Sequence, residues 1–137
     1  MRALLLDTHV WIWLMEGLPD LKQPHLEIIN KAAGESMVWI AAISLWEIGM
    51  LSRKGRIRLE KPILSWINES LSLPGIQLQA LTPLIAVESC QLPDEFHGDP
   101  ADRLIVATAR VNDLILITRD EKIVEYGKKE YISVIPV

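Results

Sequence analysis

The chain has 137 residues, of which half are hydrophobic and 23% are charged, and its formal net charge is −4. This composition excludes a disordered chain and fits one domain with a substantial core, over residues 1–137. No apolar run approaches the roughly 20 residues that span a membrane. Asp7 interrupts the apolar stretch near the start, which argues against a signal peptide. The single Cys90 excludes an internal disulfide, so we expect a cytoplasmic protein.

Apolar runs and helix signals alternate along the chain. In order, the pattern predicts a strand at 3–6 with helices at 8–15 and 24–33, a strand at 37–42 with helices at 45–52 and 62–73, a strand at 76–81 with helices at 83–91 and 100–111, a strand at 114–117, a short helix from 121 to 126, and a strand at 131–135. Strands that alternate with helices predict a mostly parallel α/β sheet covered by helices.

Capping signals predict how two early helices begin. Thr8 is expected to cap the helix at 8–15. Ser44 and Glu47 have the spacing of a capping box. In this motif Ser44 is the N-cap, and Glu47 lies in the first turn with its side chain reaching back to the N-cap amide. A carboxylate in that turn also lies at the edge of the sheet, so Glu47 has both a structural and a functional interpretation.

The helix at 100–111 has the same double interpretation. Pro100 suits the first helical position, which makes Asp99 the N-cap and places Asp102 at the third position. Asp102 then heads an apolar stripe with Ile105 and Ala109. Asp99 is interpreted as a cap, although a supporting or ligating role remains open for it.

Four acids are expected to meet at one edge of the sheet. Asp7 and Asp120 follow the first and fourth strands, and Glu47 and Asp102 begin helices. Like charges repel one another unless a cation lies between them, and oxygen ligands suit Mg²⁺ or Mn²⁺. Such an ion activates water for attack on a phosphate. Without these four charges and that of Asp99, the net charge would change from −4 to +1.

Basic residues concentrate in the segment at 53–58. Arg53, Lys54, Arg56 and Arg58 are four of the 14 Lys and Arg residues, and Gly55 predicts a loop. Composition alone favours a solvated loop. Beside an acidic metal site, however, the same loop is a candidate for phosphate contacts.

Four segments of the chain carry a family resemblance. They are Asp7-Thr-His, Ser44-Leu-Trp-Glu47, the run from Asp99 to Ala109, and Thr118-Arg-Asp120. Together they resemble the PIN-domain family, specifically its VapC-type toxins, in the family's order and over essentially the whole chain.

The resemblance implies a PIN-like three-layer sandwich and a Mg²⁺-dependent endoribonuclease that is the toxin of a toxin–antitoxin pair. It implies a homodimer, an RNA substrate and a small antitoxin that covers the site. It implies an acidic quartet that is both catalytic and metal-binding: Asp7, Glu47, Asp102 and Asp120. Thr118 is implied as a supporting hydroxyl, and Thr8 and Asp99 are grouped with it as supporting residues. The basic loop becomes a candidate RNA contact.

Three alternative functions are considered. A phosphatase of the haloacid dehalogenase type needs a second Asp two residues after the first, where this chain has His9. A response-regulator receiver domain needs paired acids near its first strand and a Lys after a late strand, but here the late strand ends in Thr118-Arg119. A catalytically silent PIN fold that only binds a partner is disfavoured, because an unused cluster of like charges destabilises a protein.

Histidine and tryptophan residues have simpler interpretations. His9, His25 and His97 are interpreted as structural, and the helix after Asp7 is expected to point the His9 ring away from an ion. Trp11 and Trp13 point in different directions on one helix, so at least one is expected to be exposed to a partner.

Overall fold

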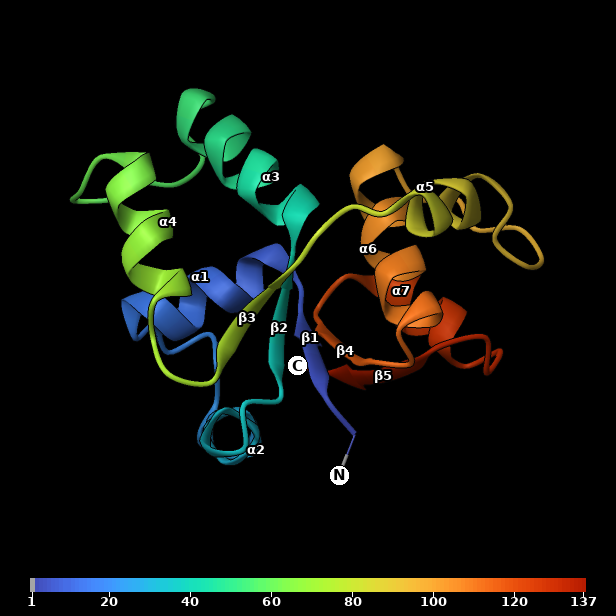
Figure 1. Ribbon diagram of the computed structural model, residues 1–137, viewed down its shortest axis with the longest axis horizontal. Helices are drawn as coiled ribbons and strands as arrows, with labels where there is room; N and C mark the ends of the chain where they lie inside the picture. The colour runs from blue at the N-terminus through green and yellow to red at the C-terminus, as the bar shows by residue number, and fades with distance from the viewer. Residues whose placement is uncertain (1) are drawn as a thin grey trace.

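The computed structural model describes residues 2–137, and its centre is a sheet of five parallel strands (Figure 1). The strand order is β3-β2-β1-β4-β5, and all four neighbouring pairs are parallel. The bounds are β1 (Leu4–Leu6), β2 (Val38–Ala41), β3 (Ile76–Gln79), β4 (Ile115–Thr118) and β5 (Ser133–Pro136). The predicted parallel sheet is confirmed.

In residues 2–137, seven helices cover the two faces of the sheet, which confirms the predicted three-layer arrangement. Alternate residues of β1 face opposite layers: Leu6 packs with Trp11 and Ile29, whereas Leu5 packs with Ile105. No helix in residues 2–137 has the length and apolar character needed to cross a membrane. The helices are α1 (Thr8–Glu16), α2 (Gln23–Gly34), α3 (Ala42–Arg53), α4 (Ile63–Leu71), α5 (Pro83–Cys90), α6 (Pro100–Val111) and α7 (Glu121–Gly127).

Two helices begin differently from the prediction. Thr8 is already helical, and the N-cap of α1 is Asp7, so the prediction that Thr8 caps this helix is wrong. α3 begins at Ala42 without a side-chain cap, so the predicted capping box is also wrong, and Glu47 lies in the second turn. The reason is that β2 passes into α3 without a loop. Ser44 is therefore enclosed, and its hydroxyl contacts Thr8 instead of the helix backbone.

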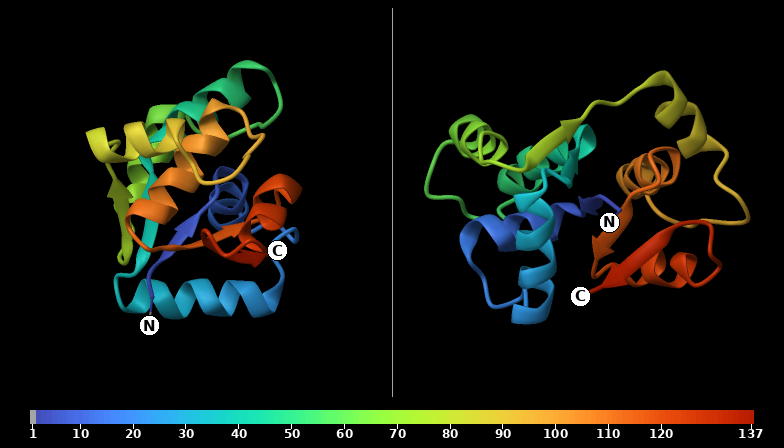
Figure 2. Two further views of the ribbon diagram at one scale, coloured as in Figure 1. Left: turned by 90° about the vertical axis from the view of Figure 1, so that its right-hand side faces the viewer. Right: turned by 60° about the horizontal axis from the view of Figure 1, so that its bottom comes forward.

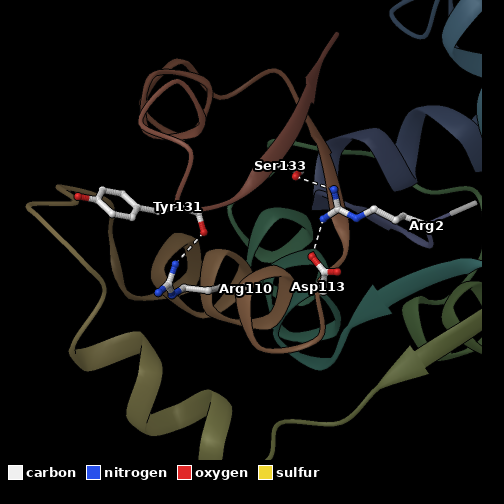
Figure 3. A network of polar contacts seen from close by, with 5 residues as sticks. All are labelled: Arg2, Arg110, Asp113, Tyr131 and Ser133. Carbon is white, nitrogen blue, oxygen red and sulfur yellow. Dashed lines mark hydrogen bonds and ion pairs between the residues drawn. The ribbon is translucent and has the colours of Figure 1, made fainter.

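A polar network stabilises the end of the sheet at which the chain starts (Figure 3). Arg2 donates hydrogen bonds to Ser133 Oγ at 2.8 Å and to Asp113 Oδ1 at 2.7 Å, and Arg110 Nη1 donates to the Tyr131 carbonyl at 2.8 Å. These bonds connect the start of the chain to β5 and to the turn after α6. α2 also lies at this end, whereas α3 and α5 extend at the opposite end (Figures 1 and 2).

Both tryptophans of α1 are buried, so the expectation that one of them is exposed to a partner is wrong. Trp11 is fully buried, and its ring lies 5.0 Å from that of Trp66. Trp13 is 6% exposed and lies beneath the guanidinium group of Arg119. The exposed tryptophan is Trp46 on α3, at 57%.

Candidate active site

The acidic residues lie at the carboxyl ends of β1 and β4, where the order of strands in the sheet reverses. β1 lies between β2 and β4, so successive strands are added on one side up to β3 and on the other from β4 onward. In open parallel sheets, ligands bind at the carboxyl ends of the strands at such a switch point. Asp7 directly follows β1, and Thr118 is the last residue of β4.

Asp7 is held by hydrogen bonds on both of its carboxylate oxygens. Oδ1 accepts the Thr8 amide at 2.8 Å, and Oδ2 accepts the Thr118 hydroxyl. The Thr118 oxygen also accepts the Asp120 amide at 3.0 Å, so this fully buried side chain connects the two strand-end acids. Burial raises the pKa of Asp7, and the two hydrogen bonds oppose that rise.

Glu47 is held by the hydroxyl of Thr8. That oxygen lies 2.6 Å from Glu47 Oε1 and 2.9 Å from Ser44 Oγ. Because a hydroxyl carries one proton, Thr8 donates it to the carboxylate and accepts from Ser44. Burial raises the pKa of Glu47, and the bond from Thr8 opposes the rise. Thr8 and Ser44 therefore position the Glu47 carboxylate. The spacing of Ser44 and Glu47 in the sequence had instead suggested that both cap a helix.

Asp99 and Asp102 differ sharply although one helical turn separates them. Asp99 is exposed and is the N-cap of α6, with Oδ1 accepting the Asp102 amide at 2.8 Å, as predicted. The carboxylate of Asp102 makes no recorded hydrogen bond with residues 2–137. Burial raises its pKa to about 7, and the charges of Asp99, Asp120, Asp7 and Glu47 add to the rise.

Gly98 allows the chain to approach α6 closely just before Asp99. A Cβ atom at this position would overlap the ring of Phe96 and would lie 2.9 Å from Cβ of Asp102. Any side chain here would therefore displace either the ring or the backbone that carries Asp102.

One depression of about 450 Å³ brings the acids together. Asp120, the N-cap of α7, accepts the Ile123 amide at 3.0 Å and faces this depression. His9 also lines it, and its charge lowers the pKa of Asp7. His9 thus borders the site, although the helix after Asp7 was expected to point its ring away from an ion. The acids that line the depression are Asp7, Glu47, Asp99, Asp102 and Asp120.

Comparison with known proteins places this chain in a family. A family model of the PIN domain matches residues 4–129. The chain belongs to the PIN domain family. Ribonuclease VapC22 of Mycobacterium tuberculosis is 35% identical to it over 123 residues, which are 90% of this chain and 91% of that protein.

Solved structures share the fold of this PIN domain. The VapBC complex of Salmonella typhimurium bound to DNA superposes with a TM-score of 0.71 at 18% identity, covering 99% of this chain and 98% of that chain. VapBC2 of Rickettsia felis, bound to a fragment of promoter DNA, gives a TM-score of 0.70 at 16% identity and covers 98% of both chains. The predicted resemblance to VapC-type PIN domains is confirmed.

The donor groups of the PIN domain suit a hard divalent ion. All five acids offer carboxylate oxygens, and the half-buried Asp102 carboxylate has no other recorded partner within residues 2–137. In that part of the chain, however, no three His, Cys, Asp or Glu side chains lie close enough to form a metal site by themselves. Carboxylate oxygens are nevertheless the type of donor that suits Mg²⁺ or Mn²⁺.

The basic loop of the PIN domain contributes one side chain to the acidic depression. Arg56 lines it, and Lys54 and Arg56 both line an apolar groove beside it. Arg53 is the last residue of α3, and neither it nor Arg58 lines either cavity. All four side chains are exposed, and none has a recorded ion pair with any residue from 2 to 137.

Sequence patterns missed two residues of this site. Arg119 and Trp13 line the depression, and the guanidinium carbon of Arg119 lies 4.2 Å from the centroid of the Trp13 ring. Arg119 was visible between Thr118 and Asp120, but only the folded chain shows that it meets a helix formed more than a hundred residues earlier.

Proposed function

We propose that this VapC-type ribonuclease homologue is a Mg²⁺-dependent endoribonuclease and the toxin of a toxin–antitoxin pair. The observation that carries the proposal is Asp102, a half-buried carboxylate with a pKa of about 7 among four other acids at the sheet's switch point. The relationship to Ribonuclease VapC22 supports RNA as the substrate.

In the proposed mechanism, the chain's own groups hold the ion and position the substrate. Asp7, Glu47, Asp102 and Asp120 would hold Mg²⁺, which when bound supplies an activated water and neutralises charge on the phosphate. Thr118 fixes Asp7 and Thr8 fixes Glu47 through hydrogen bonds, so both carboxylates keep a set orientation. Asp102 must lose its proton before it can bind the ion.

We propose two protein partners, an antitoxin and a second copy of the chain. The antitoxin would cover the depression and contact the adjoining groove, which is lined by Ile43, Trp46 and Leu104. The solved relatives named VapBC support such a partner. The homodimer would use exposed apolar side chains of the β3–α5 region, namely Leu78, Leu81, Leu84 and Val87. We place this activity in the cytoplasm.

The test of function is cleavage of total RNA by the purified protein with and without Mg²⁺. We expect Mg²⁺-dependent fragments, and we expect Asp7→Asn to lose them while retaining a folded circular-dichroism spectrum. Cleavage that persists in EDTA would contradict the proposed metal dependence. A folded protein that binds RNA or an antitoxin but never cleaves would instead support the silent binding module.

Replacing the four basic side chains of the loop by Gln should weaken RNA binding and reduce its dependence on salt. For a single strand, the slope of log K against log salt should fall by about 0.7 for each phosphate that is no longer bound. The pair Lys54→Gln with Arg56→Gln should account for most of the change, because these residues border the site. The pair Arg53→Gln with Arg58→Gln is the matched control for charge. An unchanged slope in the quadruple variant would mean that the loop is only solvated.

A further inference from the structure

Arg119 lies between two residues of the acidic site but pairs with neither. Its neighbour Thr118 bonds to Asp7, and its other neighbour, Asp120, caps α7, so the backbone of Arg119 is held on both sides. Its Nη2 atom instead donates to Asp20 Oδ2 at 3.1 Å. Within residues 2–137, this is the only hydrogen bond or ion pair recorded for the Arg119 side chain.

The guanidinium group of Arg119 is restrained but open to solvent. It stacks on Trp13, with 4.2 Å between the guanidinium carbon and the ring centroid, and the side chain remains 57% exposed. Guanidinium has five N–H donors, of which Asp20 engages one. The contact with Trp13 and the bond to Asp20 restrain the side chain, so less conformational entropy is lost when the remaining donors bind a ligand.

The proposed RNA substrate makes a phosphate the expected ligand of Arg119. Five carboxylates line the depression and repel a strand of RNA, so cationic side chains beside the strand are needed to offset that repulsion. Arg56 and Arg119 are the Lys or Arg residues that line the depression within residues 2–137, and they lie in two different loops, one after α3 and one after β4. A planar guanidinium fork matches two oxygens of a phosphate.

We infer that Arg119 is a substrate-binding residue whose guanidinium group binds an RNA phosphate at the edge of the acidic depression. This inference rests on the proposed ribonuclease function and adds a contact outside the basic loop. The competing explanation is that Arg119 only covers Trp13 and secures Asp20. An exposed ion pair contributes little to stability, so the link to Asp20 alone gives no strong reason for an Arg here.

The test compares Arg119→Gln with Arg2→Gln, a matched control whose side chain also forms an exposed ion pair, with Asp113, far from the depression. Binding of a single-stranded oligoribonucleotide is measured over a range of salt concentrations in an Asp102→Asn background, which prevents cleavage. We expect Arg119→Gln to weaken binding about tenfold and to lower the salt slope by about 0.7, with no change for Arg2→Gln. In the cleaving protein, Arg119→Gln should raise KM more than it lowers kcat.

Two further variants separate binding from structure. Arg119→Lys keeps the charge but loses the fork, so we expect the salt slope to be retained and the affinity to fall. Asp20→Asn removes the partner of Arg119 but leaves its charge, so RNA binding should be unchanged or tighter. If Arg119→Gln and Asp20→Asn lower the melting temperature alike and both leave the salt slope unchanged, the inference is overturned. Unchanged affinity in Arg119→Lys would also overturn it, even if Arg119→Gln fails to fold.

The same experiment distinguishes this inference from the proposed function. If the unmodified folded protein neither binds nor cleaves RNA, the ribonuclease proposal fails and the inference fails with it. If the unmodified protein cleaves RNA and the loop variants lower the salt slope, but Arg119→Gln does not, only the inference fails.

Discussion

Millimolar Mg²⁺ is expected to raise the melting temperature of this protein by several degrees at about pH 8 and by much less at about pH 5.5, because a ligand that binds only the folded state stabilises it. The pH dependence follows from Asp102. Its pKa in the folded protein is about 7, because burial and the neighbouring carboxylates disfavour its charge. Below that pH a proton occupies the group that should bind the ion.

The same pKa determines how the stability of the metal-free protein changes with pH. The unfolded chain releases the Asp102 proton near the ordinary pKa of 3.8, whereas the folded chain keeps it to about 7. The folded state therefore holds more protons across this range, and stability without metal falls as the pH rises through it. Burial raises the pKa of Asp7 and of Glu47 as well, so these groups act in the same direction.

Asp102→Asn is the variant that tests this explanation. Its amide cannot ionise, so the metal-free variant should melt higher than the unmodified protein at about pH 8, and Mg²⁺ should shift its melting temperature little. Asp113→Asn is the matched control, because Asp113 is exposed and lies at the other end of the sheet, beside Arg2. Identical melting curves in Mg²⁺ and in EDTA at both pH values would count heavily against a metal site.

The order of strands and helices was predictable because local signals and the fold agree. Short apolar runs such as Leu114 to Ile117 are too short for helices, and Pro100 and Gly17 mark helix boundaries. Once the strands are parallel, their carboxyl ends meet, so Asp7 and Asp120 had to approach each other. The Asp99 cap was equally predictable, because a cap depends on residues within one turn.

What the sequence did not reveal depends on contacts between distant segments. Ser44 and Glu47 have the local spacing of a capping box, yet both interact with Thr8, more than 35 residues away. Arg119 finds Asp20 at a separation of 99 residues. Such pairs form only after the sheet has assembled, and spacing along the chain carries no signal for them.

Asp99→Ser should retain most of the nuclease activity, whereas Asp102→Ser should lose it by orders of magnitude, as expected when a metal ligand is removed. Serine at position 99 keeps an oxygen that can accept the Asp102 amide, so α6 should remain capped and the variant should melt close to the unmodified protein. Serine at position 102 removes a carboxylate that accepts no hydrogen bond from residues 2–137 and so contributes little to the fold.

A change in pH dependence gives this pair of variants a second, independent readout. After burial, the charge of Asp99 is the largest cause of the raised pKa of Asp102. Removing that charge should lower the pKa of Asp102, so the rising limb of the activity profile of Asp99→Ser should move to lower pH. A variant that only lost its helix cap would melt lower without this shift. If Asp99→Ser instead folds normally and is as inactive as Asp102→Ser, then Asp99 belongs to the metal site, and the acidic site has five members in place of four.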